Sequence, residues 1–511
     1  MPQRFYSNPV LNADWSDPDV IRVDGDFYLT ASSFNRVPGL PILHSRDLVE
    51  WNLIGHALER LTPEDHFALP RHGAGVWAPT IRYRDGIFYI FYPDPDHGIY
   101  VVTASDPAGP WSAPHLLYAG RGLIDPCPFW DDDGKAYLAH AWAKTRAGFW
   151  NRITMLEMAP DASRIIGAPA TLIEGEDLPG FIVLEGPKIY KREGWYWVFA
   201  PAGTVPIGWQ SVFRSQQIWG PYEERTVLAQ GTSSVNGPHQ GAWVTDVDDQ
   251  DWFVHFQDRG AFGRVVHLQP MGWGDDGWPR MGTNAQGALG TRAGEPVLRH
   301  PVPAGSTHPE RPPRRWGGAL PPHWHWQANP GSDWLVEHDD RNLVLSALPN
   351  DTVNLREIPQ VLGHRVPGVA STTCATIGID NPVAGTRAGI VVLGKTYFWI
   401  GVRSRAGGVL ALEAATGGFA RVEEIHSSVV VEPDARVTCR VSISDAGIVT
   451  ASWRVGESAW NHVGHEFTMT PGMWIGAEVG LFATSPVGTE GDLPKGLFED
   501  VDIVERGEQP R

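Results

Sequence analysis

A short hairpin motif recurs five times in the first 260 residues, and this repeat constrains the fold more than any other feature of the chain. Its clearest copy spans residues 184–199, where a strand (PKIYK) leads into a turn at Gly194 and then into an aromatic strand (WYWVF). The other copies turn at Gly25, Gly86, Gly134 and, without a glycine, before Trp252. Tight turns flanked by β-branched and aromatic residues are typical of β-hairpins. With a spacing of about 50 to 60 residues, the repeat predicts an all-β fold that begins with a five-bladed β-propeller.

One position in each copy carries a chemically distinctive side chain. Counting eight or nine residues back from the turn, or to the corresponding place in the fifth copy, gives three carboxylates, an indole and an imidazole: Asp17, Asp125, Glu185, Trp77 and His239. The start of the innermost strand of each propeller blade faces the central axis, so these side chains are expected around one hole. Carboxylates crowded in a partly dry funnel repel one another, and their desolvation is costly. This register therefore predicts a functional site.

Each of these positions also has a structural explanation. The Asp-Pro and Glu-Gly-Pro sequences can simply initiate turns, but three acids in one register favour a site. Asp19 is a rival to Asp17, because strand alternation places both on the same side; Asp17 is preferred since Asp19 lies deeper. Trp77 offers a flat apolar wall for a sugar ring, with core packing as the alternative. A lone histidine in a β protein is more often a hydrogen-bonded core residue, and the register is what singles out His239.

Composition excludes several classes of protein. The net charge of −18 argues against nucleic acid or an anionic membrane as a partner. The opening MPQRFYSNPVL lacks a signal pattern, and no apolar run reaches the roughly 18 residues of a membrane span, so a cytoplasmic location is expected. Cys127, Cys374 and Cys439 lie in strand-like segments and are expected to be free buried thiols.

A chain of 511 residues is long enough for two domains. We assign residues 1–300 to the propeller, as the catalytic domain. Residues 301–330 are rich in proline and arginine without strand periodicity, which predicts an ordered linker. Alternating apolar runs over residues 331–511 predict an antiparallel two-sheet β-sandwich. This accessory domain carries no carboxylates in register, so we expect it to bind carbohydrate, or to support the propeller and lend a loop to its rim.

The motifs of the first 300 residues resemble those of glycoside hydrolase family 43. They are, in order, SDPDV, GVWAP, LIDPCPFWDDDGKAYL, LEGPKIYKREGWYWVF and FGRVVHLQ. The C-terminal part is similar to the concanavalin-like β-sandwich of the family's β-xylosidase members. The resemblance implies that Asp17 is the general base, Glu185 the general acid, and Asp125 the residue that tunes and orients Glu185.

The resemblance also implies how the substrate is held. Phe34 and Trp77 would wall the sugar, and Arg264, in FGRVVHLQ, would reach its hydroxyls. His239 would help to hold a hydrated Ca²⁺ ion on the propeller axis, while the chemistry itself would need no cofactor.

The predicted carboxylates suit inverting hydrolysis of a glycosidic bond. The reaction needs a protonated acid at the leaving oxygen and an ionised base roughly 6.5–9.5 Å away, with a water between base and sugar. We expect an exo-acting glycoside hydrolase that releases terminal β-D-xylose from xylo-oligosaccharides. An α-L-arabinofuranosidase acting on arabinoxylan or arabinan fragments is the alternative, and a non-catalytic carbohydrate-binding propeller is the rival from another class. A small oligosaccharide is the expected partner in each case, and the oligomeric state is left open.

Overall fold

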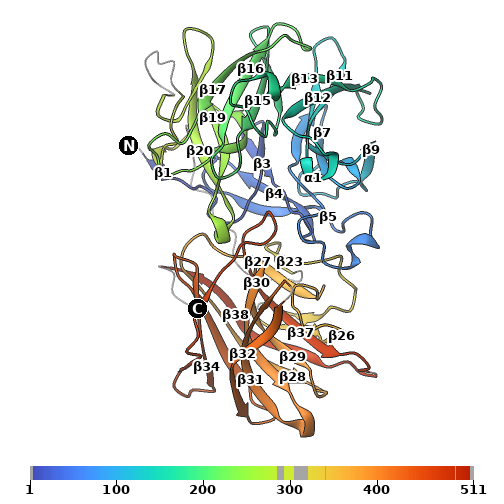
Figure 1. The fold of residues 1–511 in the computed structure, drawn as a ribbon, viewed down its shortest axis with the longest axis vertical. Helices are drawn as coiled ribbons and strands as arrows, with labels where there is room; N and C mark the ends of the chain where they lie inside the picture. The colour runs from blue at the N-terminus through green and yellow to red at the C-terminus, as the bar shows by residue number, and fades with distance from the viewer. Residues whose placement is uncertain are drawn as a thin grey trace.

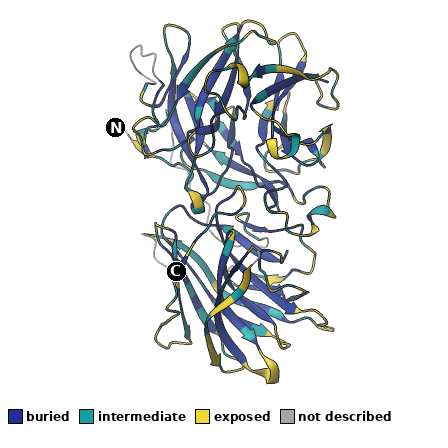
Figure 2. Ribbon diagram, in the orientation of Figure 1, coloured by how far each residue is buried: buried dark blue, intermediate teal, exposed yellow. Residues whose placement is uncertain are grey.

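The computed structural model describes residues 4–284, 293–303, 320–339, 341–419, 421–489 and 491–506. Two β-rich bodies are stacked end to end, the N-terminal half at the top and the C-terminal half at the bottom of Figure 1. Buried stretches run along the strands of both halves, and exposed residues gather in the turns (Figure 2). Within these ranges no helix has the length and apolar character needed to cross a bilayer.

The N-terminal half is a five-bladed β-propeller, as the repeat predicted. Each blade is an antiparallel sheet of four consecutive strands. Blade 1 contains β2 (Asp19–Val23), β3 (Asp26–Thr30), β4 (Gly39–Ser45) and β5 (Asn52–Leu58). Blade 2 contains β6 (Thr80–Arg84), β7 (Ile87–Asp94), β8 (Gly98–Ala104) and β9 (His115–Ala119). Blade 3 contains β10 (Leu123–Trp130), β11 (Ala136–Trp142), β12 (Arg152–Met158) and β13 (Ala170–Glu174). Blade 4 contains β14 (Lys188–Arg192), β15 (Trp195–Ala202), β16 (Trp209–Ser215) and β17 (Glu223–Leu228), and blade 5 contains β18 (His239–Thr245), β19 (Asp251–Asp258), β20 (Arg264–Trp273) and β21 (Pro279–Met281).

Local turn chemistry explains why these hairpins form. Glu193 and Gly194, between β14 and β15, have φ angles of 52° and 78°, as a type I′ turn requires of both central residues. Apolar side chains then fill the space between neighbouring blades, such as Ile153 of blade 3 and Val198 of blade 4, both 0% exposed. The helical segments are short: α1 (Lys144–Ala147), η1 (His66–Ala68), η2 (Gly175–Asp177), η3 (Gly260–Phe262), η4 (Gly282–Asn284) and η5 (Ala406–Gly408).

In the described chain every blade is built from one continuous run of residues. No blade therefore combines strands from the beginning and the end of the propeller. Outside the blades, β1 (Phe5–Ser7) pairs with β22 (Arg299–Pro301). An isolated bridge joins Leu11 to Val266 of blade 5. Blades 1 and 5 therefore meet through side chains and these flanking contacts.

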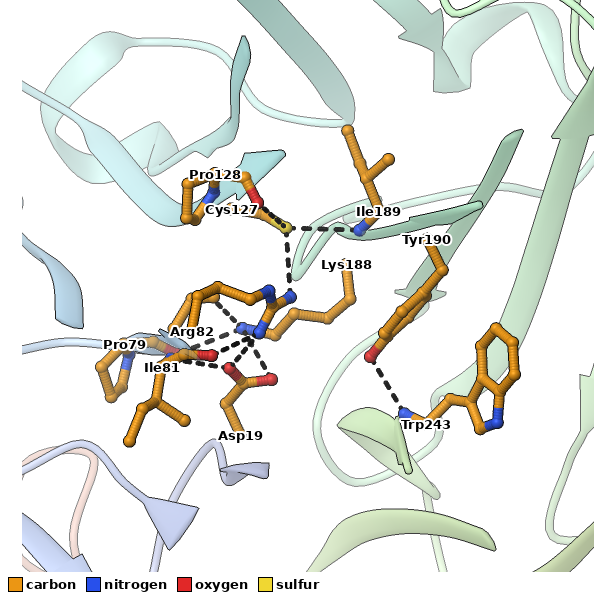
Figure 3. A network of polar contacts seen from close by, with 11 residues as sticks. Asp19, Pro79, Ile81, Arg82, Cys127, Pro128, Lys188, Ile189, Tyr190 and Trp243 are labelled. Carbon is orange, nitrogen blue, oxygen red and sulfur yellow. Dashed lines mark hydrogen bonds and ion pairs between the residues drawn. The ribbon is translucent and has the colours of Figure 1, made fainter. Parts of the chain in front are cut away.

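Polar contacts tie the inner strands of the blades together around the axis (Figure 3). Asp19 of blade 1 is completely buried; it lies 2.7 Å from Arg82 Nη1 of blade 2 and 3.7 Å from Lys188 Nζ of blade 4. In blade 3, the Cys127 sulfur accepts hydrogen bonds from Arg82 and from the Ile189 backbone N–H. Asp19 thus joins blades 1, 2 and 4 through buried polar contacts.

The C-terminal half is a β-sandwich of two antiparallel sheets with one parallel strand pair. The first sheet contains β23 (Trp324–Trp326), β26 (Leu348–Asn350), β27 (Val361–Arg365), β29 (Arg387–Leu393), β30 (Thr396–Ser404), β31 (Leu410–Gly418), β32 (Arg421–Val431) and β37 (Glu478–Pro486). The second contains β24 (Leu335–His338), β25 (Leu343–Ser346), β28 (Ser371–Asp380), β33 (Val437–Ile443), β34 (Ile448–Val455), β35 (Asn461–His462), β36 (Phe467–Thr468) and β38 (Lys495–Glu505). The three cysteines are free, as expected; Cys127 and Cys439 are buried, whereas Cys374 is only half-buried.

The predicted linker needs a correction at its C-terminal end. Residues 324–326 form β23, which pairs with β27, so the first strand of the sandwich lies inside the range 301–330. A three-residue strand has no periodicity to read, and only its partner defines it. Residues 304–319 of the expected linker lie outside the described residues.

Candidate active site

The three carboxylates lie near the axis-facing starts of the inner strands. Asp17 precedes β2, Asp125 lies at an irregularity in β10, and Glu185 precedes β14. The charges of Asp125 and Asp17 both raise the pKa of Glu185, so the three groups share one electrostatic environment. Residues from three different blades therefore meet at a single site.

Asp17 is held in one orientation by donors on two sides. Ser32 Oγ donates to Asp17 Oδ2 at 2.5 Å, and Arg264 Nη1 lies 3.1 and 3.3 Å from the two carboxylate oxygens. The backbone of Asp17 has a φ of 56°, in a region that few residues other than glycine adopt. Such strain persists only where the surroundings impose it, and it is common at functional sites. Asp17 is thus placed as a fixed acceptor, as a base requires.

The surroundings of Asp125 and Glu185 raise the pKa of both carboxyl groups. Burial and the charge of Asp17 raise the pKa of Asp125 to about 7, against the opposing effects of the Gly186 N–H, Lys188 and Gln240. Burial, then Asp125, then Asp17 raise the pKa of Glu185 well above its ordinary value, while Arg264 opposes the shift. The Glu185 side chain is 21% exposed, compared with 7% for Asp17. The raised pKa therefore favours the protonated form of Glu185, and its side chain is the more accessible of the two.

His239 lies beside the acid, at the first residue of β18. Its Nε2 is 3.6 Å from Glu185 Oε1, and the ring is 0% exposed. Burial and the nearby charge of Arg264 lower its pKa to about 3, so the imidazole is neutral. In the described ranges no three His, Cys, Asp or Glu side chains are grouped to hold a metal, and Ca²⁺ prefers six to eight oxygen ligands. The described residues around His239 do not form such a cage, and its role toward a metal stays a prediction.

Two aromatic rings lie on segments next to the carboxylates: Phe34 follows Ser32, which binds Asp17, and Trp77 packs against the cluster that contains Leu184, the neighbour of Glu185. Phe34 and Trp77 pack with their centroids 6.1 Å apart; Phe34 is 2% exposed, whereas Trp77 is half-buried and presents more surface to a ligand. The Arg146 guanidinium lies 5.4 Å from the Trp77 ring centroid. Trp474, from the sandwich, packs edge-on against Trp77 at 5.9 Å and is 44% exposed. The expectation that the sandwich lends a loop to the rim therefore fits this contact.

Sequence reasoning missed several of these residues. Trp474 and Arg146 carried no signal, because nothing in the sequence says which loops face the propeller funnel. Gln240 could have been proposed as a site residue, because its amide directly follows His239, one of the five axis-facing positions. Arg264 was expected to reach sugar hydroxyls; its side chain contacts Asp17 and lies 4.9 Å from the Phe256 ring centroid. What the structure shows is that it orients the Asp17 carboxylate, and contact with the sugar stays a prediction.

A carboxyl group with a raised pKa near an oriented second carboxylate is the arrangement that a glycoside hydrolase uses. Comparison with known proteins identifies the family. The family model for glycosyl hydrolases family 43 matches residues 6–279, and that for the β-xylosidase C-terminal concanavalin A-like domain matches residues 316–494. The chain belongs to glycoside hydrolase family 43.

Similar proteins agree with this assignment. A protein from Xylanibacter ruminicola, whose name refers to β-xylosidase, is 38% identical over 400 residues, covering 78% of this chain and 72% of its own length. A β-xylosidase from Formosa agariphila is 29% identical, with coverage of 94% and 87%. A non-reducing-end α-L-arabinofuranosidase from Bacteroides ovatus is 30% identical, with coverage of 77% and 74%. Among solved structures, a xylan β-1,4-xylosidase from Bacillus halodurans has the same fold, with a TM-score of 0.85, 23% identity and coverage of 96% and 99%.

Proposed function

We propose that this enzyme releases terminal β-D-xylose from the non-reducing ends of short xylo-oligosaccharides with inversion at the anomeric carbon. The observation that supports the reaction type best is the raised pKa of Glu185 beside the oriented carboxylate of Asp17. The names of the relatives from Xylanibacter ruminicola and Formosa agariphila support the choice of sugar.

In the proposed reaction, Asp17 accepts a proton from a water molecule as the water oxygen attacks the anomeric carbon. The bond from that carbon to the leaving oxygen breaks, and Glu185 gives its proton to the leaving oxygen. Asp125 keeps Glu185 protonated and accepts a hydrogen bond from the Gly186 N–H at 2.8 Å, which holds the backbone next to the acid. Trp77 presents its ring to the sugar, and no residue is covalently modified.

Release of α-L-arabinofuranose is the second candidate. The Bacteroides ovatus relative named as an α-L-arabinofuranosidase is 30% identical to this chain, and no contact among the described residues distinguishes the two sugars. Both are terminal pentoses that the same acid and base could release.

The test uses nitrophenyl β-D-xyloside, nitrophenyl α-L-arabinofuranoside and xylobiose. We expect the xyloside to have the higher kcat/KM, and proton NMR of the xylobiose reaction to show α-xylose as the first-formed anomer. First formation of β-xylose would contradict inversion, and a preference for the arabinofuranoside would select the second candidate. Turnover of none of the three would contradict the proposal.

A further inference from the structure

A chain of buried charges crosses the interface between the sandwich and the propeller. Arg36 of the propeller contacts two carboxylates: its Nη2 lies 2.8 Å from Asp14 Oδ2, and its Nε donates to Glu478 Oε1 of β37 at 2.5 Å. Arg36, Asp14 and Glu478 are 2%, 1% and 5% exposed. Burial alone would raise the pKa of Glu478, but His325 and Arg36 hold it well below its ordinary value. Since a buried charge is costly without its partner, each of these groups depends on the next.

Asp14 extends the chain of charges to the catalytic base. Its Oδ1 accepts a hydrogen bond from the Arg264 backbone N–H at 3.0 Å, and the Trp15 N–H donates to the Arg264 carbonyl at 2.8 Å. A Cβ atom at Gly263 would lie 2.3 Å from Asp14 Oδ1, so the backbone is fitted closely around this carboxylate. From this backbone the Arg264 guanidinium reaches Asp17. The position of Asp14 therefore sets the position of the arginine that orients the base.

The sandwich also holds the loop that carries Phe34. Val37 and Trp326 of β23 exchange two backbone hydrogen bonds, of 3.0 and 2.7 Å. Asn35 Nδ2 donates to the Gln327 carbonyl at 2.8 Å. Phe34 has a φ of 52°, a conformation that needs support from its surroundings. Contacts from the sandwich thus support the loop of Phe34 directly and Asp17 through Arg36, Asp14 and Arg264.

We propose that Glu478 and Arg36 are positioning residues for glycoside hydrolysis, acting through Asp14 and Arg264 on Asp17. Under this proposal the sandwich is a working part of the catalytic apparatus, because one of its carboxylates fixes the geometry of the base. The inference rests on the hydrolase reaction proposed above. If the buried charges only joined the two domains, their loss would change stability and leave the chemistry intact.

Glu478→Gln is the sharpest test, because it removes the charge and keeps the size and an oxygen that can accept from Arg36. We expect kcat for nitrophenyl xyloside to fall about 10- to 100-fold, as a displacement of about 1 Å can cause, with a smaller change in KM. The alkaline limb of the kcat profile should move to higher pH, because Arg264 is the cation that lowers the pKa of Glu185. All rates are measured on the full chain well below its melting temperature.

Asn329→Ala is the matched control. Asn329 is 4% exposed and bridges the same two domains, since its side chain exchanges hydrogen bonds of 2.7 and 2.9 Å with the Leu61 backbone. Within the described ranges its hydrogen bonds go to Leu61, Glu64 and Phe67, and none reaches Arg36, Asp14 or Glu478. We expect a lower melting temperature with the wild-type kcat and pH profile. Arg36→Lys and Arg36→Met test the propeller side: the lysine variant should keep more of kcat than the methionine variant.

The outcomes are decisive in either direction. A folded Glu478→Gln enzyme with the wild-type kcat and alkaline limb would overturn the proposal, as would an equal loss of kcat in Asn329→Ala. If Glu478→Gln does not fold, the two Arg36 variants decide, and equal kcat values for them would contradict positioning. A wild-type enzyme inactive on every substrate would mean that the proposed function fails, and this inference would fall with it.

Discussion

Replacement of Asp125 by Asn should shift the pH range in which the enzyme works. An amide oxygen can still accept the 2.8 Å hydrogen bond from the Gly186 N–H, so the backbone beside Glu185 should keep its place. What the variant loses is the negative charge that, after burial, does most to raise the pKa of Glu185. The scale of the effect follows from Coulomb's law: two unit charges about 6 Å apart at an effective dielectric constant of about 20 repel by about 3 kcal/mol, or about two pKa units.

The sign of this effect can be read from a pH–rate profile. Without Asp125 the pKa of Glu185 falls, so the acid loses its proton at lower pH and the alkaline limb of kcat should move down by about one to two units. The measurement is kcat on nitrophenyl xyloside from acid to alkaline pH in buffers of constant ionic strength. Asp133→Asn is the control, because Asp133 is an exposed turn residue of the same blade that accepts a hydrogen bond from the Lys135 N–H.

Stability should respond to the same substitution. Burial and the charge of Asp17 raise the pKa of Asp125 from 3.8 to about 7, so the folded protein binds this proton more tightly than the unfolded chain does. The resulting stabilisation is complete below about pH 4 and is lost as pH rises through about 7, at most about 4 kcal/mol in all. Asn has no proton to lose, so the variant should gain melting temperature relative to wild type between pH 5 and pH 8. An unmoved alkaline limb together with an unchanged stability difference would refute the reasoning.

Three further predictions address the rest of the structure. Glu185→Gln and Asp17→Asn should each lower kcat on xylobiose by about 10²- to 10⁴-fold with an unchanged circular dichroism spectrum, and substantial turnover by either would contradict its assigned role. Trp474→Ala should raise KM for xylo-oligosaccharides about tenfold in steady-state assays, because the half-exposed ring packs on the aromatic wall; an unchanged KM would remove it from the binding site. Lys188→Met should lower the free energy of unfolding by about 3–5 kcal/mol in urea titrations, because Asp19 would lose one of its two cationic partners; a change below about 1 kcal/mol would contradict that role.

The propeller could be predicted because the residues that specify each hairpin are close together in the sequence. Each hairpin is specified by a few neighbouring residues, such as the Glu193–Gly194 pair with its two positive φ angles. Propeller symmetry then carries Asp17, Asp125 and Glu185 to one place, although they are far apart in the chain. The short strand at residues 324–326 could not be predicted, because it is defined only by pairing with β27.

The parts of the site that depend on packing between the two domains could not be predicted from the sequence. Arg36 and Glu478 are separated by 442 positions, and no periodicity relates them. Trp474 lies in a loop of the sandwich, and nothing local shows that this loop meets Trp77. Arg264 was noticed through its motif, but its partner Asp17 is 247 positions away. Contacts of this kind follow from the tertiary arrangement alone.

The way the ring closes has a consequence for catalysis. No strand passes from the last blade into the first in the described chain, so the joint between blades 1 and 5 is a seam where two separately built sheets abut. Asp17 stands on one side of this seam and Arg264 on the other. Parting of the ring at this point would have to break the backbone hydrogen bonds of Leu11 and Trp15 to Val266 and Arg264, and it would separate Asp17 from its arginine while all five sheets stayed intact. Turnover would then report the integrity of the seam before any loss of blade structure did.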